Sequence, residues 1–277
     1  MLRPTVSGVG VWRPFVLGAV LGGLAVARLM MERPAGPQAA VPESRPSEPS
    51  SRPWCPPEFL AHSNWHYLRV DESGWSTGPV GSFRDLGERL DRPDVATEVL
   101  IPVFPTVFVP TMDDKVYYDA ILTSDIRPGD KVLVIGTGSG ADAWAAWLKS
   151  RSLIRVVELN PMAAVNARVT ARLAGFPIRV VTGDITRVEL PEDFTDFDCV
   201  LWNMPFLEPA GGLAHCLYHD GDTGPLLKAF LERLPSLLKR GGKAILLNTT
   251  YAAEYFRLPG ATSRPDGYCT LYVVPNP

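Results

Sequence analysis

The chain has 277 residues, 46% of them hydrophobic, which is enough for one domain of about 200 residues with a sizeable core. The formal net charge is -3 and unevenly spread: residues 1–57 hold six Arg and three Glu, so residues 58–277 keep 21 basic and 27 acidic side chains. This acidic balance argues against a general nucleic-acid-binding surface, although a local basic patch stays possible. Small-molecule or protein partners are favoured.

A hydrophobic stretch lies in the first segment, residues 1–32. Residues 14–27 are uncharged and are flanked by Arg13 and Arg28. This run is shorter than the ~20 apolar residues that span a bilayer comfortably, but flanking Arg side chains can reach the membrane surface. A single membrane anchor is one interpretation. A signal peptide with a cleavage site near Ala25–Ala27, or an over-extended start, are the alternatives.

The next two segments contain no motif that indicates a function. Residues 33–57 are rich in Pro, Ser and Ala, which predicts an extended, disordered linker. Residues 58–110 predict a small N-terminal cap, with a helical patch at 82–90. Within the cap, two prolines interrupt β-branched and aromatic residues at 99–109, which predicts edge strands or a hairpin.

Strands and helices are expected to alternate through the main domain, residues 111–277. Short β-branched runs predict the strands, and the segments with helical spacing between them predict the helices. This alternation predicts an α/β fold with a doubly wound, mostly parallel sheet. The expected strands are 131–135, 154–159, 178–182, 199–202, 244–248 and 270–274, and the expected helices are 117–122, 141–149, 161–174 and 226–238.

The stretch K-V-L-V-I-G-T-G-S-G, residues 131–140, combines a short β-branched apolar run, typical of a buried central strand, with a glycine-rich loop. A loop of this kind between a strand and a helix presents backbone N–H groups to a ligand. With Glu158 at the distance where an acid would meet a ribose, the loop also satisfies a loose dinucleotide fingerprint. The stretch therefore predicts a cofactor site without naming the cofactor.

Polar residues also follow the later strands. Asp184 ends T-G-D after the third strand, and the fourth strand runs into N-M-P-F at 203–206. The polar segment H-D-G-D-T-G follows at 219–224. Because the carboxyl ends of parallel strands meet at one edge, where open α/β sheets bind their ligands, we expect one shared crevice.

Together these motifs resemble the class I methyltransferases that use S-adenosylmethionine, and within them the N-P-P-Y/F branch that methylates planar nitrogen. The nearest resemblance is to the HemK-type protein-glutamine methyltransferases and their relatives acting on RNA or DNA amino groups. It covers roughly residues 109–248 and includes D-G-x-x-G at 220–224. The resemblance implies a seven-stranded Rossmann-like sheet, S-adenosyl-L-methionine as cofactor, and direct in-line methyl transfer to a protein side chain or small molecule.

The resemblance also implies cofactor contacts. The glycine backbone would admit the methionine end, Glu158 would accept hydrogen bonds from the ribose hydroxyls, and Asp184 would accept one from the adenine amino group. The implied cofactor-binding residues are Gly136, Gly138, Gly140, Glu158, Asn160, Asp184, Ile185 and Asn203.

Asn203, Pro205 and Phe206 are the implied catalytic residues. The side-chain carbonyl of Asn203 and the backbone carbonyl of Met204 would accept hydrogens from a substrate NH2, which directs its lone pair at the methyl carbon. Phe206 would stack on the planar acceptor. The chain departs from the signature at Met204, where the family has proline, so the loop loses a fixed φ angle. The alternative is that Asn203 caps a turn and Phe206 packs.

Other functions have weaker support. An NAD(P)-dependent oxidoreductase could use the same loop but leaves N-M-P-F without a role, and a catalytically silent, membrane-tethered binding module could keep the fold as a scaffold. S-adenosylmethionine is a cytosolic metabolite, so a cytosolic domain, possibly membrane-anchored, is expected. No metal is expected, because no C-x-x-C pair occurs and no third ligand with suitable spacing accompanies His215 and His219.

Overall fold

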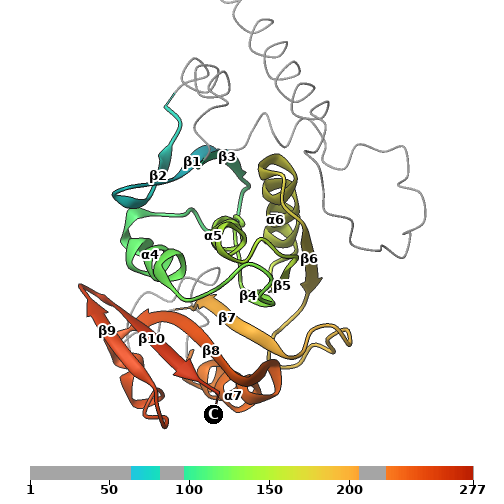
Figure 1. Cartoon of the computed structure of the whole chain (residues 1–277). Helices are drawn as coiled ribbons and strands as arrows, with labels where there is room; N and C mark the ends of the chain where they lie inside the picture. Colours follow the sequence, from blue (N-terminus) through green and yellow to red (C-terminus); the bar gives the residue numbers. More distant parts are fainter. Residues whose placement is uncertain (1–63, 82–96, 206–222, 277) are drawn as a thin grey trace, which may run out of the picture. The chain divides into compact units, whose positions relative to one another are not determined.

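The computed structural model describes residues 64–81, 97–205 and 223–276 (Figure 1). These residues belong to one unit of the chain, Asn64–Pro277. Within the described ranges, no helix is both long enough and apolar enough to cross a membrane.

Three predicted segments lie outside the described residues: the hydrophobic segment 1–32, the linker 33–57 and the helical patch 82–90. The membrane anchor and the linker therefore stay predictions. The division of the chain between cap and main domain also stays a prediction.

The described part of the expected cap is a three-stranded antiparallel sheet. Its order is β2 (Gly74–Pro79), β1 (Asn64–Asp71), β3 (Glu98–Val103). Gly74, which follows the turn between β1 and β2, has a φ of 90°, a conformation that glycine adopts readily. Pro102 lies in β3, which is an edge strand and therefore tolerates the missing N–H.

A buried side chain connects this small sheet to the main domain. The amide of Asn166 donates to the Pro102 carbonyl at 2.8 Å and accepts from the Phe104 N–H at 2.8 Å. The side chain of Asn166 is fully buried, so both hydrogen bonds form away from water. The chain that follows β3 is thereby held close to the main sheet.

The main sheet has seven strands in the order β6-β5-β4-β7-β8-β10-β9. All strands run parallel except β10, which is antiparallel to both of its neighbours. The predicted α/β fold with a mostly parallel, seven-stranded sheet is confirmed. The strands are β4 (Val132–Ile135), β5 (Ile154–Glu158), β6 (Ile178–Thr182), β7 (Phe197–Asn203), β8 (Leu238–Thr249), β9 (Thr262–Asp266) and β10 (Cys269–Pro275).

Helices cover both faces of this sheet (Figure 1). The helix α7 contributes Leu227, Phe230 and Leu234 to a core that also contains Leu133 and Trp202 from the sheet. Figure 1 shows the other three α-helices on the opposite side. The helical elements are η1 (Met112–Asp114), α4 (Lys115–Thr123), α5 (Ala141–Ser150), α6 (Pro161–Ala174), α7 (Thr223–Leu237) and η2 (Thr250–Glu254).

The bounds of α6 agree with those predicted because local signals define both ends. The side chain of Asn160 accepts from the Met162 N–H at 2.9 Å, and Pro161 occupies the first turn. At the other end, Gly175 adopts the left-handed conformation with a φ of 72°.

The expected start of β8 was wrong, whereas the expected end of the preceding helix lies within one residue of the observed end of α7. The helix α7 ends at Leu237 and β8 begins directly at Leu238, so the Gly241-Gly242 pair lies within the strand. A Cβ atom on Gly242 would lie 2.7 Å from the Phe197 carbonyl oxygen. Glycine at this position therefore allows β8 to approach the start of β7.

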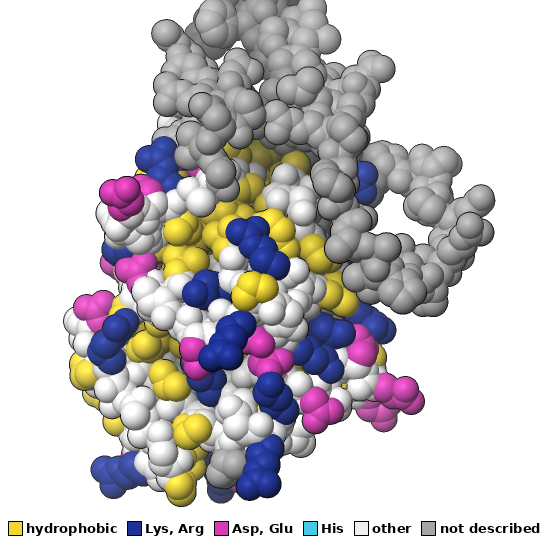
Figure 2. Space-filling view, viewed as in Figure 1, with side chains coloured by type: hydrophobic (Ala, Val, Ile, Leu, Met, Phe, Trp, Pro, Cys, Tyr) yellow, Lys and Arg dark blue, Asp and Glu magenta, His cyan; other side chains and the backbone are white. Residues whose placement is uncertain are grey.

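Charges of both signs are interspersed on one face of the molecule (Figure 2). On the described surface, Asp193 pairs with Arg155 at 3.0 Å and with Arg179 at 2.8 Å. Pairs of this kind contribute little to stability. The mixture of signs on this face agrees with the small net charge of the chain.

Candidate active site

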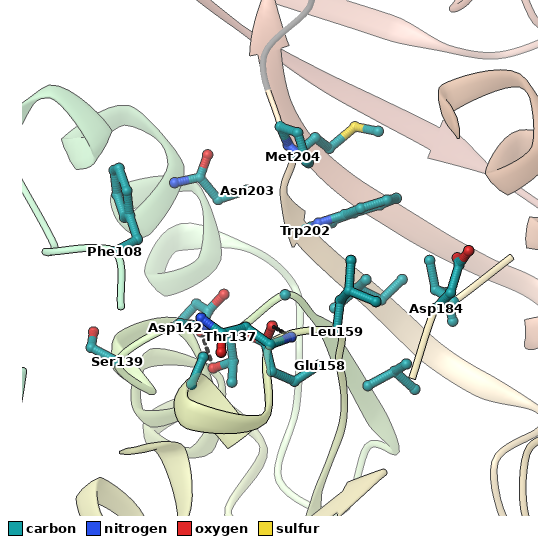
Figure 3. A pocket seen from close by; sticks show the side chains of 18 of the residues that line it. Phe108, Thr137, Ser139, Asp142, Glu158, Leu159, Asp184, Trp202, Asn203 and Met204 are labelled. Atoms are coloured by element: carbon teal, nitrogen blue, oxygen red, sulfur yellow. Dashed lines mark hydrogen bonds between the residues drawn. The ribbon is translucent and has the colours of Figure 1, made fainter. Parts of the chain in front are cut away.

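The carboxyl ends of β4, β5, β6 and β7 surround a cavity of about 500 Å³ (Figure 3). The structure thus brings together side chains from four separate strand ends, as expected for this sheet edge. The predicted site residues that line the cavity are Gly136, Gly138, Glu158, Asn160, Asp184, Ile185, Asn203 and Pro205. Gly140 does not line it, and Phe206 lies outside the described residues.

The first two glycines of the loop keep the cavity open. Gly136 has a φ of 60° and Gly138 a φ of 55°, which L-amino acids with side chains rarely adopt. A Cβ on Gly136 would lie 3.0 Å from the indole nitrogen of Trp202, which also lines the cavity. A side chain here would fill space that a ligand could use.

Gly140 serves packing between helices. It has a φ of 90°, and a Cβ atom here would lie 3.1 Å from Cβ of Thr170 and 3.2 Å from Cα of Ala167. Both of these residues belong to α6. The third glycine of the loop therefore allows the start of α5 to approach α6.

Glu158, at the end of β5, joins the glycine loop to the start of α6. Its carboxylate accepts from the Gly138 N–H at 3.0 Å and from the Asn160 N–H at 2.9 Å. The side chain is buried, and this burial raises the pKa of Glu158 while the backbone N–H groups oppose the shift. Glu158 thus presents fixed oxygen acceptors at the cavity wall.

Asp184 and two apolar side chains form the neighbouring wall. Oδ1 of Asp184 accepts from the Thr186 N–H at 2.8 Å and from the Thr186 hydroxyl at 2.7 Å. Oδ2 forms an ion pair with Nε of Arg187 at 3.7 Å, beyond hydrogen-bond distance, so it can accept a hydrogen bond from a ligand. Leu159 is 69% exposed although it is a large apolar residue, and it lines the cavity with the buried Ile185. This wall combines apolar surface with a hydrogen-bond acceptor. Our sequence interpretation placed Leu159 at the end of the expected strand 154–159 and not in the site, because its exposure is visible only in the structure.

Asn203, at the end of β7, contacts a carboxylate from a distant part of the chain. Its side-chain NH2 donates to Oδ1 of Asp114 at 3.0 Å, across 89 residues of sequence. Asp114 is 2% exposed, and its burial raises its pKa against the effect of its hydrogen bonds. Our sequence interpretation did not identify Asp114.

Hydrogen bonds hold the loop after β7 at Met204, the position where the N-P-P-Y/F signature has a proline. The Met204 N–H donates to the Leu247 carbonyl at 3.1 Å, which continues the pairing of β7 with β8. The side chain of Asn248 donates to the Pro205 carbonyl at 3.3 Å. The side chain of Met204 is buried in the core. The expected loss of constraint is therefore offset by hydrogen bonds and burial.

Asp142 in the first turn of α5 is a second carboxyl group that our sequence interpretation missed. It lines the cavity, is 3% exposed, and accepts from the Thr137 hydroxyl and from the Ala143 N–H. Its burial raises its pKa to about 8. No ion pair to Asp142 is present among the described residues. A carboxyl group in this environment favours its protonated form at neutral pH.

No cluster of three or more potential metal ligands occurs within the described ranges. His215 and His219, which the sequence raised as a possible metal pair, lie outside those ranges.

No model of a known protein family matches the sequence. A protein of Methanocaldococcus jannaschii that carries the provisional name protein N5-glutamine methyltransferase is 28% identical over 163 residues, which are 56% of this chain and 79% of that protein.

Two solved structures share the fold at low identity. The 16S rRNA N2 G1207 methyltransferase of T. thermophilus, in complex with AdoMet and guanosine, gives a TM-score of 0.54 at 17% identity. The match covers 65% of this chain and 48% of that protein, so the chain spans about half of its length. A methyltransferase from Pyrococcus furiosus gives a TM-score of 0.50 at 16% identity, over 69% of this chain and 94% of that protein. At these identities the likeness establishes the fold alone.

Proposed function

We propose that the chain is a class I S-adenosylmethionine-dependent methyltransferase that methylates the side-chain amide nitrogen of a glutamine in a protein. The proposal extends to this chain the acceptor named for the M. jannaschii relative. The structural observation that supports it is the hydrogen bond from the NH2 group of Asn203 to Asp114, which leaves the side-chain carbonyl of Asn203 for the acceptor.

The cavity fits the cofactor on the chemistry of its lining residues. Gly136 and Gly138 carry no side chain where the methionine end would approach. Glu158 would accept from the ribose hydroxyls, and the second oxygen of Asp184 would accept from the adenine amino group. Leu159 and Ile185 supply apolar surface for the adenine ring.

Asn203 would bind and orient the acceptor amide. An amide NH2 is a poor nucleophile because its lone pair is delocalised, and two acceptors on its hydrogens would direct that lone pair at the methyl carbon. The Asn203 side-chain carbonyl can supply one acceptor, since its NH2 is engaged with Asp114. The Met204 backbone carbonyl would supply the second.

The cofactor, when bound, supplies a methyl group activated by a positively charged sulfur. The acceptor nitrogen would form a bond to the methyl carbon as the sulfur–methyl bond breaks, which leaves neutral S-adenosylhomocysteine, and one of the two protons on the nitrogen would pass to solvent. The residues assigned above contribute positioning and hydrogen bonding, and none of them forms a covalent bond with the substrate.

The experiment offers the full chain a library of glutamine-containing peptides and S-adenosylmethionine with a labelled methyl group. Each peptide has a matched control with glutamate in place of glutamine, and a structured RNA serves as a competing acceptor. We expect label on glutamine peptides only, and mass spectrometry should place it on the side-chain nitrogen. Label on the glutamate controls, or on RNA alone, would refute the proposed acceptor.

The matched enzyme variant is Asn203→Ala. We expect kcat to fall by about 100-fold, which is typical for removal of a preorganised hydrogen-bonding group at a reacting centre. The affinity for S-adenosylhomocysteine should stay within about twofold, because the other cofactor contacts remain. An equal loss of both quantities would contradict the role of Asn203 toward the acceptor.

A further inference from the structure

An asparagine can carry out the proposed role in only one of two orientations. Its side chain ends in a carbonyl, which accepts hydrogens, and an NH2 group, which donates them. Rotation about the last side-chain bond exchanges the two, and this torsion has a broad energy profile. The carbonyl of Asn203 can accept a hydrogen bond from the NH2 group of the methyl acceptor. The NH2 group of Asn203 cannot, because two donors would face each other. The site therefore needs a group that selects one orientation of Asn203.

Asp114 has the hydrogen-bonding properties to make that selection. An ionised carboxylate only accepts hydrogen bonds, so the side chain of Asn203 must turn its NH2 group toward Asp114 Oδ1, 3.0 Å away. The reverse orientation would bring the carbonyl oxygen of Asn203 against the carboxylate oxygen, and these two acceptors repel each other. Burial makes this difference larger than it would be in water.

The carboxylate of Asp114 is itself held in place. Its second oxygen, Oδ2, accepts from the hydroxyl of Thr111 at 3.0 Å and from the Thr111 N–H at 3.4 Å. The contact with the Thr111 N–H is part of a capping box at the start of η1. Oδ2 therefore faces Thr111, and Oδ1 is left for Asn203.

We propose that Asp114 is a positioning residue that turns the Asn203 amide so that its carbonyl is presented to the methyl acceptor. The inference rests on the proposed function and deepens it. Asp114 acts through Asn203 and is assigned no contact with the acceptor or the cofactor. It does not line the cavity, which agrees with an indirect role.

The test compares Asp114→Ala and Asp114→Asn with the control Asp113→Asn. Asp113 neighbours Asp114 in η1 but is exposed. Methyl transfer to a labelled glutamine peptide gives kcat and KM, and calorimetry gives the affinity for S-adenosylhomocysteine. We expect Asp114→Ala to lower kcat by roughly 10- to 100-fold through misorientation of the acceptor, and to leave the S-adenosylhomocysteine affinity within about twofold.

Asp114→Asn keeps the volume of the side chain. We expect it to lower kcat at least as much as Asp114→Ala, because the Thr111 donors keep the amide oxygen at the Oδ2 position, so that the NH2 group faces Asn203 and favours the reverse orientation of its amide. Asp113→Asn should keep wild-type kinetics. Wild-type kcat in Asp114→Ala, or a loss of cofactor affinity as large as the loss of kcat, would overturn the inference.

A double-mutant cycle separates positioning from a structural role. In an Asn203→Ala background no amide remains to be turned, so Asp114→Ala should change the residual single-turnover rate by less than about twofold. If Asp114→Ala lowers the rate equally in both backgrounds, its role is structural and the inference fails. If the wild-type protein labels no glutamine peptide, the proposed function fails, and the inference fails with it. If methyl transfer occurs but does not depend on Asp114, only the inference is refuted.

Discussion

The backbone N–H of Met204 donates to the carbonyl of Leu247 at 3.1 Å, one residue beyond the paired end of β7. A proline at position 204 has no N–H and could not form this hydrogen bond. This chain therefore constrains the loop by strand pairing. The N-P-P-Y/F signature constrains the same position by the fixed φ of proline.

Restoring the family signature should harm this protein. We expect Met204→Pro to lower the free energy of unfolding by about 1–3 kcal/mol, because the Leu247 carbonyl loses its donor and a buried side chain is shortened. The control Met204→Leu keeps the N–H and most of the apolar volume, so it should change stability by less than about 1.5 kcal/mol. Chemical denaturation measures both variants. A Met204→Pro protein as stable as wild type would show that this hydrogen bond contributes little.

Glu158→Gln should weaken cofactor binding. The N–H groups of Gly138 and Asn160 contact different oxygens of the Glu158 carboxylate, and glutamine replaces one of these oxygens with an NH2 group, so one contact and one charged acceptor for the ribose hydroxyls are lost. Loss of a charged hydrogen bond typically costs about 1.5–3 kcal/mol, so the dissociation constant for S-adenosylhomocysteine should rise roughly 10- to 100-fold. Calorimetry measures the change, and the exposed Glu189→Gln is the matched control. An unchanged affinity would remove Glu158 from the cofactor site.

The buried carboxyl group of Asp142 should make stability depend on pH. Its pKa is about 8 in the folded protein against an ordinary value of 3.8, so between these pH values the folded state binds more protons than the unfolded state. The stability contributed by this group is therefore greatest at low pH and falls as the pH rises toward 8. Asp142→Asn cannot ionise and should lack this decline.

Melting temperatures of the wild type and of Asp142→Asn at pH 5 and pH 8.5 test this sign. We expect the variant to melt higher than the wild type at pH 8.5, and the difference should shrink at pH 5. A difference of the same size at both pH values would contradict the shift in pKa.

Gly140 and Gly175 form a matched pair for the packing of α5 on α6. Both have a positive φ, but a Cβ on Gly140 meets Thr170 at 3.1 Å, whereas a Cβ on Gly175 meets nothing within 4 Å. Gly140→Ala should therefore carry overpacking in addition to backbone strain and lower the melting temperature by about 5 °C more than Gly175→Ala does. If both variants lower the melting temperature equally, the close contact between position 140 and Thr170 does not affect stability.

Local signals in the sequence were sufficient to predict most of the fold. The helix α6 has an N-cap, a proline and a C-terminal glycine within its own segment, and its predicted bounds agree with the structure. The strand β9 was missed because its residues T-S-R-P-D are all exposed and show no apolar alternation. The early start of β8 was missed because the close approach of Gly242 to Phe197 depends on the paired sheet.

The sequence predicted only those site residues that directly follow a strand of the parallel sheet. Glu158, Asp184 and Asn203 follow parallel strands, so the fold alone places them at one edge. Asp114 reaches Asn203 across 89 residues, and nothing in its own segment indicates that contact. Asp142 did leave a local signal, since it is an acid within the apolar stretch A-D-A-W-A-A-W.

Calorimetric titration of the full chain with S-adenosylhomocysteine tests the central claim most directly, with NADH as the competing ligand. The account predicts saturable one-to-one binding of S-adenosylhomocysteine, retained in Asn203→Ala and weakened in Glu158→Gln, and no heat of binding with NADH. Absence of S-adenosylhomocysteine binding, or saturable binding of NADH in its place, would contradict the account.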